Sequence, residues 1–94
     1  MTTGKRLLSK VAPSARKYQA IGNPYRLAIL YLLAENPSTP GALAAAIGMT
    51  GSLLTHHLDI LRRSGWIVRS GKIGRIVTYS MPQKSLAEFK KLLA

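Results

Sequence analysis

His56 and His57 are the side chains whose types suit metal binding or proton transfer near neutral pH. Adjacent residues on a helix point about 100° apart, so the two rings do not converge on one ion as an i, i+4 pair does. The spacing of the neighbouring leucines places His57 at the edge of a core and His56 on an outer face. The chain has no cysteine and only three acidic residues. Because no Ser/His/Asp or paired-carboxylate arrangement and no phosphate-binding glycine loop is present, we expect no metal site, no cofactor and no enzymatic activity.

The two histidines belong to a segment, Thr50 to Gly65, that is typical of a helix with two different faces. Thr50 is a favourable N-cap, and Gly65 is the residue type that often ends a helix in the left-handed conformation. Leu54, Leu58 and Leu61 recur at the spacing of one buried stripe. The opposite face can meet water or the edges of bases, and it carries Ser52, Thr55, His56, Asp59, Arg62 and Arg63.

A second predicted helix precedes this segment. Thr39 and Pro40 give an N-cap followed by proline at the first helical position, and Gly48 ends the helix. Two helices separated by a short turn that contains glycine form a helix-turn-helix, whose second helix enters the DNA major groove. We therefore expect base contacts from Ser52, Thr55 and His56.

The pattern changes from helix to strand after the helix-turn-helix. Residues 66–70 and 75–81 are rich in β-branched and aromatic types, and Gly71 to Gly74 supply the predicted turn. A hairpin in this place is a wing, and the tip, with Lys72 or Arg75, could reach the minor groove. The residues expected to contact the DNA backbone are Thr50, Gly51, Arg62, Arg63, Arg69, Lys72 and Arg75.

The beginning of the chain divides into a predicted arm and the start of the domain. Residues 1–12 are basic and contain no acid, which indicates a flexible N-terminal arm. We expect residues 13–94 to form the domain, with a first helix from about Pro13 to Ile21. A helix from Pro24 to Glu35, apolar nearly all the way round, should lie at the centre of the domain.

The last predicted helix runs from Leu86 to Leu93, after a capping box formed by Ser85 and Glu88. A helix this short is unstable alone, so it must pack on its own subunit or on a second copy of the chain. No apolar run is long enough to span a membrane. The candidate residues for a subunit interface near the two ends of the chain are Val11, Ala15, Tyr18, Leu86, Phe89 and Leu93.

The charge of the chain favours a polyanionic partner. Fourteen Lys and Arg against three acids give a formal net charge of +11 and an isoelectric point near 10.8. Together with the docking motif, this predicts a sequence-specific regulator bound to double-stranded DNA. The main alternative is an architectural or nucleoid-type protein whose affinity comes almost entirely from phosphate contacts. A winged helix that binds protein instead of DNA is disfavoured by the charge.

Residues 18–81 resemble the winged helix-turn-helix core of the ArsR family of bacterial and archaeal repressors. This resemblance implies a mainly α fold with a small antiparallel β-hairpin. It also implies a homodimer built through the first and last helices, which binds an imperfect inverted repeat and usually blocks transcription. We expect the protein to lie in the cytoplasm, on DNA. The matching parts are Asn23-Pro24-Tyr25-Arg26-Leu27, Thr55-His56-His57-Leu58-Asp59-Ile60-Leu61, Ser64-Gly65 and Gly74-Arg75-Ile76-Val77-Thr78-Tyr79.

Two departures from the family pattern affect the expected function. Many members sense metals through cysteines, or through His and carboxylate ligands on the last helix, whereas this chain offers only Glu88 on that helix. We therefore expect no metal or thiol sensor site. Gly51 stands where resembling proteins more often have a polar side chain, which removes one base-reading group and lets the helix N-terminus approach a phosphate more closely.

Overall fold

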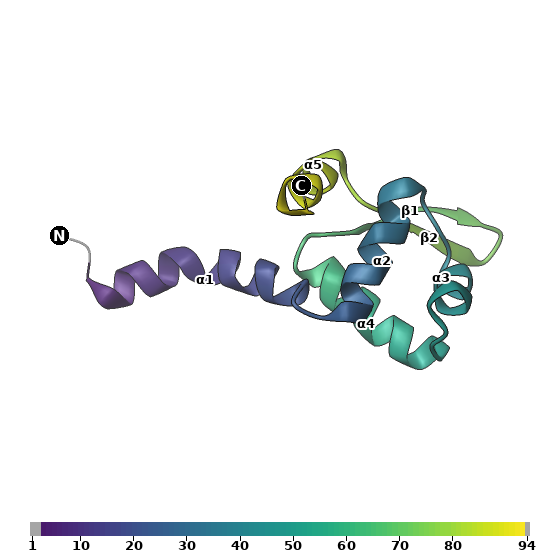
Figure 1. Cartoon of the computed structure of the whole chain (residues 1–94), viewed down its shortest axis with the longest axis horizontal. Helices are drawn as coiled ribbons and strands as arrows, with labels where there is room; N and C mark the ends of the chain where they lie inside the picture. The colour runs from purple at the N-terminus through teal and green to yellow at the C-terminus, as the bar shows by residue number, and fades with distance from the viewer. Residues whose placement is uncertain (1–2, 94) are drawn as a thin grey trace.

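The computed structural model describes residues 3–93 and has five helices and one two-stranded antiparallel sheet in that range. The fold is a mainly α winged helix-turn-helix, as the sequence predicted (Figure 1). Among the described residues, no helix is both long and apolar enough to cross a membrane. The elements in chain order are α1 (Gly4–Ala20), α2 (Pro24–Glu35), α3 (Pro40–Ile47), α4 (Gly51–Arg63), β1 (Val68–Ile73), β2 (Ile76–Ser80) and α5 (Gln83–Leu93).

Helix α2 lies at the centre of the domain. Asn23 caps it, because the side-chain oxygen accepts hydrogen bonds from the backbone N–H groups of Tyr25 and Arg26 at 2.9 and 3.1 Å. Its apolar residues enter a core with Leu43 of α3 and the leucines of α4, and this core confirms the predicted central helix. The buried apolar residues of these elements are Ile29, Leu30, Leu33, Leu43, Leu54, Leu58, Leu61, Trp66 and Ile67.

The turn between α3 and α4 has the chemistry that the sequence predicted. The hydroxyl of Thr39 accepts from the N–H of Ala42 at 3.2 Å, and that of Thr50 accepts from the N–H of Leu53 at 3.3 Å. Gly48 ends α3 with a φ of 80°, a conformation that other residues rarely adopt. Each helix begins at its own cap, so the caps fix where α3 and α4 begin. The buried leucines of α4 then hold this helix against α2 and α3.

The wing is a hairpin whose turn lies later in the chain than predicted. β1 and β2 are antiparallel, with Ile73 opposite Ile76, so the turn consists of Gly74 and Arg75. Gly74 has a φ of 63°, which a hairpin turn of two residues requires at its first position. The prediction of a turn over residues 71–74 is wrong, because β1 continues past a bulge between Arg69 and Gly71 and ends at Ile73.

Helix α1 begins at Gly4, so the predicted start at Pro13 is wrong. The Thr3 hydroxyl accepts from the N–H of Arg6 at 3.2 Å and caps the helix, and Pro13 lies inside it. A proline removes one backbone hydrogen bond, which this helix tolerates. Residues 4–12 are therefore helical instead of forming an irregular arm, and Figure 1 shows α1 projecting from the rest of the domain. The mobility predicted for residues 1–12 stays a prediction, and residues 1 and 2 lie outside the described range.

Helix α5 begins at Gln83, three residues before the predicted start. The predicted capping box does not form, since Ser85 donates to the carbonyl of Gly65 at 3.0 Å and Glu88 binds groups of α1. Phe89 is only 2% exposed and packs edge-on against Trp66. It belongs to the core of its own chain. Its predicted place in a subunit interface stays a prediction.

Candidate nucleic-acid interface

The outer face of α4 carries the side chains predicted to contact bases. Ser52, Thr55 and His56 are all exposed, on the side of the helix opposite its buried leucines. The Thr55 hydroxyl donates to the carbonyl of Gly51 at 2.8 Å, so its lone pairs and its methyl group remain for an outside partner. The Thr50 and Ser52 hydroxyls lie 3.5 Å apart. The helix thus presents a row of short polar groups beside one imidazole.

His57, unlike the exposed His56, is buried and only 6% exposed. Its Nδ1 lies 3.1 Å from Nη1 of Arg26, and because a guanidinium only donates, the imidazole accepts. The ring also stacks on Tyr25, with centroids 5.7 Å apart. Burial, and then the charges of Arg26 and His56, lower the pKa of His57. The predicted core-edge position is confirmed, and the neutral form fits this site.

Asp59 holds both arginines at the end of α4. Its two carboxylate oxygens lie 3.1 Å from Nη2 of Arg62 and 3.0 Å from Nε of Arg63. The arginine side chains stay 43% and 78% exposed, so these surface ion pairs are weak and a phosphate can compete for either guanidinium. The two cations exceed the one carboxylate, so the end of the helix keeps a positive charge.

The wing carries three cations, of which one is at the tip. Arg75 occupies the turn and is exposed, as predicted for a wing-tip residue. Lys72 lies on β1 opposite Val77, so its predicted place in the loop is wrong, although its side chain is exposed. Arg69 is exposed at the base of β1, beside the bulge. Ile76, which the sequence analysis did not single out, is 55% exposed next to Arg75.

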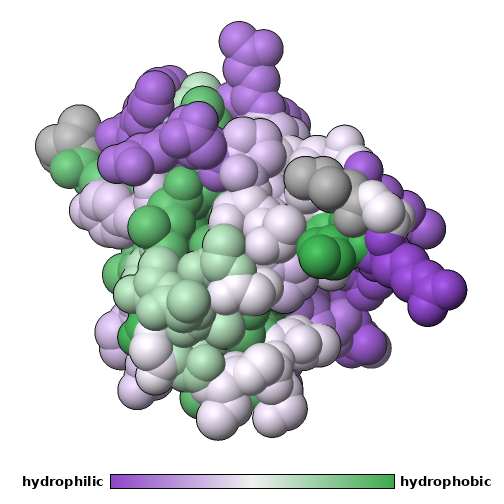
Figure 2. Space-filling model, turned by 90° about the vertical axis from the view of Figure 1, so that its right-hand side faces the viewer, coloured by the Kyte–Doolittle hydropathy of each residue, from purple (hydrophilic) through white to green (hydrophobic). Residues whose placement is uncertain are grey.

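Small side chains cover the surface of α3 beside the recognition face. Ala42, Ala45 and Ala46 are exposed on this helix. Figure 2 looks at the side of the molecule with the wing and α3, and it shows an apolar surface bordered by hydrophilic side chains. Because alanine side chains are short, a large partner can approach the α3 backbone closely on this side.

Helices α1 and α5 are joined at Glu88. This carboxylate accepts hydrogen bonds from Nζ of Lys17 at 2.8 Å and from the hydroxyl of Tyr18 at 2.6 Å. The bond from Lys17 is the main reason why the pKa of Glu88 is lowered, and Glu88 in turn raises the pKa of Tyr18. Trp66 also donates from its indole nitrogen to the carbonyl of Lys17 at 2.7 Å. The potential metal ligand named on the last helix therefore has structural partners.

Within residues 3–93, no group of three or more His, Asp or Glu side chains is placed to hold a metal ion. The predicted absence of a metal sensor stays a prediction, which metal titration of the protein tests.

The candidate interface residues near the chain ends divide into exposed and packed ones. Val11 and Tyr18 are each 44% exposed, and Ala15 is exposed between them. Leu93 is also exposed, whereas Leu86 packs against the core of its own chain. The sequence analysis missed exposed leucines at positions 7, 8 and 92, although alternate spacings of three and four residues in α1 were a usable signal. The residues that this spacing joins are Leu8, Val11, Ala15 and Tyr18.

Comparison with known proteins places this geometry in a family. The model of the family described as "Bacterial regulatory protein, arsR family" matches residues 23–68. The uncharacterized HTH-type transcriptional regulator MJ1325 of Methanocaldococcus jannaschii is 33% identical over 87 residues, which are 92% of this chain and 97% of MJ1325. The chain belongs to the ArsR family. These matches confirm the resemblance that the sequence showed. ArsR-family proteins are DNA-binding transcriptional regulators.

The chain is also similar to one further regulator in sequence and to one solved structure. The HTH-type transcriptional regulator CmtR of Mycobacterium tuberculosis is 38% identical over 73 residues, 78% of this chain, which spans only 61% of CmtR. The solution structure of Mb0332 from Mycobacterium bovis matches with a TM-score of 0.86 at 25% identity, over 97% of this chain and 84% of that one. It is described as a homodimeric winged helix-turn-helix DNA-binding domain of a possible ArsR-family regulator.

Proposed function

We propose that this ArsR-family protein is a sequence-specific, dimeric repressor that binds an imperfect inverted repeat in double-stranded DNA and has no metal or thiol sensor site. The observation that carries the proposal is the outer face of α4, where Ser52, Thr55 and His56 are exposed together at the start of the second helix of a helix-turn-helix. In this motif, residues near the beginning of the second helix contact base edges in the major groove.

The base-reading roles follow from the side-chain chemistry. Hydroxyl groups such as that of Ser52 both donate and accept, so they can pair with different base edges. Thr55 offers acceptor lone pairs and a methyl group suited to the thymine methyl, because its own proton is committed to Gly51. His56, which is fully outside the core, adds a ring nitrogen that can pair with a purine acceptor or an amino group.

The positive charges outside this row supply the phosphate contacts. Arg62 and Arg63 leave Asp59 for a phosphate at little cost, since their pairs are exposed. At the other end of α4, a side chain on Gly51 would meet nothing within 4 Å, so a phosphate has open access to the first turn after Thr50. Arg69 and Lys72 line the wing, and Arg75 at its tip is placed to enter a narrow A·T minor groove.

An exposed apolar stripe on α1, formed by Leu8, Val11, Ala15 and Tyr18, supports dimerisation. Leu7 and Leu8 are 50% and 68% exposed on a helix that projects from the domain (Figure 1). An isolated helical segment is marginal in water, so the projecting part gains stability by packing on a second copy of the stripe. The homodimer described for Mb0332, whose fold covers almost the whole chain, agrees with this arrangement. The exposed Leu92 and Leu93 of α5 are available to the same interface.

The architectural alternative is supported by the net charge of +11. A spacing experiment separates the two functions. A duplex selected from random DNA is compared with one that carries five more base pairs, about half a helical turn, between the half-sites. A dimeric sequence reader loses most of its affinity for the longer duplex, because the second α4 then faces the wrong side of the DNA. Equal affinity for both duplexes identifies the architectural binder.

Repression is tested by transcription in vitro from a promoter that carries the selected site. Added protein should reduce transcript from this promoter and leave a promoter without the site unchanged. An increase in transcript would identify an activator and would leave the DNA-binding proposal intact.

A further inference from the structure

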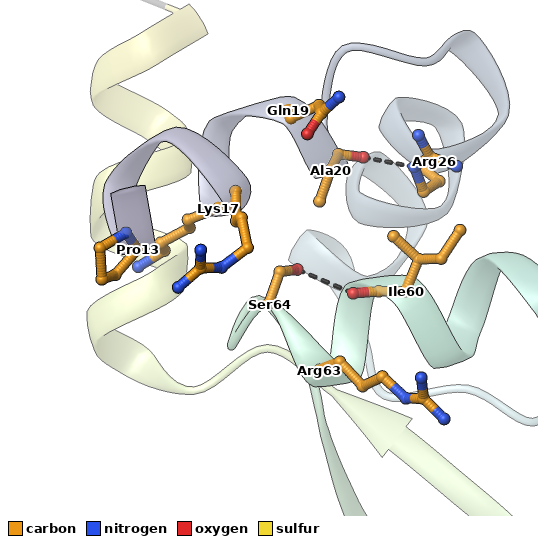
Figure 3. A pocket seen from close by; sticks show the side chains of 9 residues that line it. Pro13, Lys17, Gln19, Ala20, Arg26, Ile60, Arg63 and Ser64 are labelled. Atoms are coloured by element: carbon orange, nitrogen blue, oxygen red, sulfur yellow. Dashed lines mark hydrogen bonds between the residues drawn. The ribbon is translucent and has the colours of Figure 1, made fainter. Parts of the chain in front are cut away.

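A cavity of about 550 Å³ opens between the end of α1, the beginning of α2 and the end of α4. Arg16 and Lys17 reach it from α1, Arg26 from α2 and Arg63 from α4. Figure 3 shows Lys17, Arg26 and Arg63 arranged around this cavity on their three helices. Ligand sites commonly have volumes of this size. This cavity is lined by α1, the helix proposed for dimerisation, and by α4, the helix proposed to contact bases.

The lining of the cavity is strongly cationic. None of its described lining residues is acidic, and the carboxylates that pair with Lys17 and Arg63 belong to Glu88 and Asp59, outside the lining. The guanidinium of Arg16 forms no ion pair with any carboxylate within residues 3–93. Like charges held close together repel one another, so an anion in the cavity would relieve this repulsion.

The helix ends beside the cavity do not oppose an anion. Backbone carbonyls at the end of a helix carry negative partial charge, but here each of the last carbonyls of α1 has a donor. Trp66 donates to the carbonyl of Lys17, and Arg26 donates to that of Ala20. At the end of α4, the Ser64 hydroxyl donates to the carbonyl of Ile60 at 2.9 Å. Arg26 is thus engaged by the carbonyl of Ala20, whereas the side chains of Arg16, Lys17 and Arg63 donate to none of these carbonyls.

Apolar atoms complete the site. Ile60 and Ala20 contribute hydrocarbon surface between the cations. We propose that the cavity binds a small organic anion, a carboxylate or phosphate on a compact apolar body, and that this ligand regulates the DNA binding proposed above. The regulatory part rests on that proposed function, whereas binding of the anion does not.

Arg63 couples anion binding in the cavity to DNA binding. Its Nε is bound to Asp59 on the face of α4 that meets DNA, and an anion in the cavity competes for the same guanidinium. When Arg63 turns to the anion, Asp59 keeps only Arg62 and presents more negative charge to the DNA. The ligand therefore weakens DNA binding and acts as an inducer.

The test measures anion binding and DNA binding separately on the full chain. Phenyl phosphate is titrated at constant ionic strength while backbone amide shifts are followed by NMR, with inorganic phosphate as a second probe. The variant Arg16→Gln removes one charged donor, which should weaken phenyl phosphate binding by about tenfold or more. Lys10→Gln is the matched control, because it removes one charge from the same helix outside the cavity.

We expect saturable shifts around Ala20 and Ser64, tighter binding of phenyl phosphate than of inorganic phosphate, and an affinity that Lys10→Gln leaves unchanged. Saturating phenyl phosphate should weaken DNA binding by about fivefold or more, a typical allosteric coupling. No saturable binding, or equal loss in the two variants, overturns the site. A loss of DNA affinity in Arg16→Gln without binding of the free anion assigns the cavity to a DNA phosphate and overturns the proposal. Anion binding by a protein that binds no DNA would leave the site standing and refute the proposed function instead.

Discussion

Arg26 donates from Nη1 to Nδ1 of His57 across 3.1 Å and so joins the first turn of α2 to the buried face of the recognition helix. The same guanidinium donates from Nε to the carbonyl of Ala20, at the end of α1. One side chain therefore links α1, α2 and α4. Because His57 belongs to α4, a change at this residue acts directly on the contact between α2 and α4.

Protonation of His57 should destabilise the fold. Its folded pKa is lowered from 6.5, mainly by burial, so the unfolded chain binds a proton more readily. This stability is fully present above about pH 6.5 and is lost as pH falls through the folded pKa. Urea denaturation between pH 7.5 and 5 should show a smaller free energy of unfolding at the acidic end. The variant His57→Gln should show a flatter profile. His56→Gln removes only the smallest cause of the lowered pKa of His57 and should keep most of the slope. A wild-type slope that persists in His57→Gln would contradict the role given to His57.

Glu88→Gln should loosen the junction between α1 and α5. It removes the charge that Lys17 and Tyr18 bind, and since the Glu88 side chain is 26% exposed, we expect a loss of about 1 kcal/mol at pH 7. The folded pKa of Glu88 is lowered, so its contribution is present above the unfolded value near 4.5 and lost as pH falls below it. Wild type and variant should therefore converge in acid. An equal difference at pH 7 and pH 3 would assign the effect to packing instead of charge.

The apolar stripe of α1 should control the oligomeric state. Replacing Leu8 and Val11 together by Gln should shift a dimer to a monomer at micromolar concentration in sedimentation equilibrium, because both side chains are exposed in the single chain. Lys10→Gln on the same helix is the control and should remain dimeric. If the double variant keeps the dimer, another surface holds the two copies together.

Metals and oxidants should not change DNA affinity. The chain has no cysteine, and Glu88 is occupied by Lys17 and Tyr18. Anisotropy titrations with zinc, cadmium, arsenite or peroxide at non-denaturing levels should give the same dissociation constant as the untreated protein. A stoichiometric and reversible metal effect would direct attention back to His56, His57 and Glu88.

The features that were predictable from sequence are those fixed by local chemistry. The caps at Thr39 and Thr50 and the glycines at positions 48 and 65 define the helix-turn-helix within a few residues of chain. The start of α1 was missed because proline was expected to end or open a helix, whereas Pro13 is tolerated inside a helix capped at Thr3.

Contacts between distant parts of the chain were not predictable in this way. The capping box at Ser85 matched a local pattern, but that hydroxyl binds the carbonyl of Gly65, 20 residues away. The indole of Trp66 similarly binds the carbonyl of Lys17, at a separation of 49 residues. Which of several possible partners a polar group takes depends on how the helices pack, and one sequence does not reveal that arrangement.

In the proposed function, the outer face of α4 reads base sequence. The decisive measurement is the affinity of Thr55→Ala and His56→Ala for a selected duplex and for random DNA, with Lys72→Ala and Arg75→Ala as comparisons. Each α4 variant should lose roughly 1–3 kcal/mol on the selected site and much less on random DNA. Each wing variant should weaken binding to both duplexes and lower the salt slope by about one counterion. Equal losses on selected and random DNA for Thr55→Ala and His56→Ala would contradict the claim and identify a protein that binds only the DNA backbone.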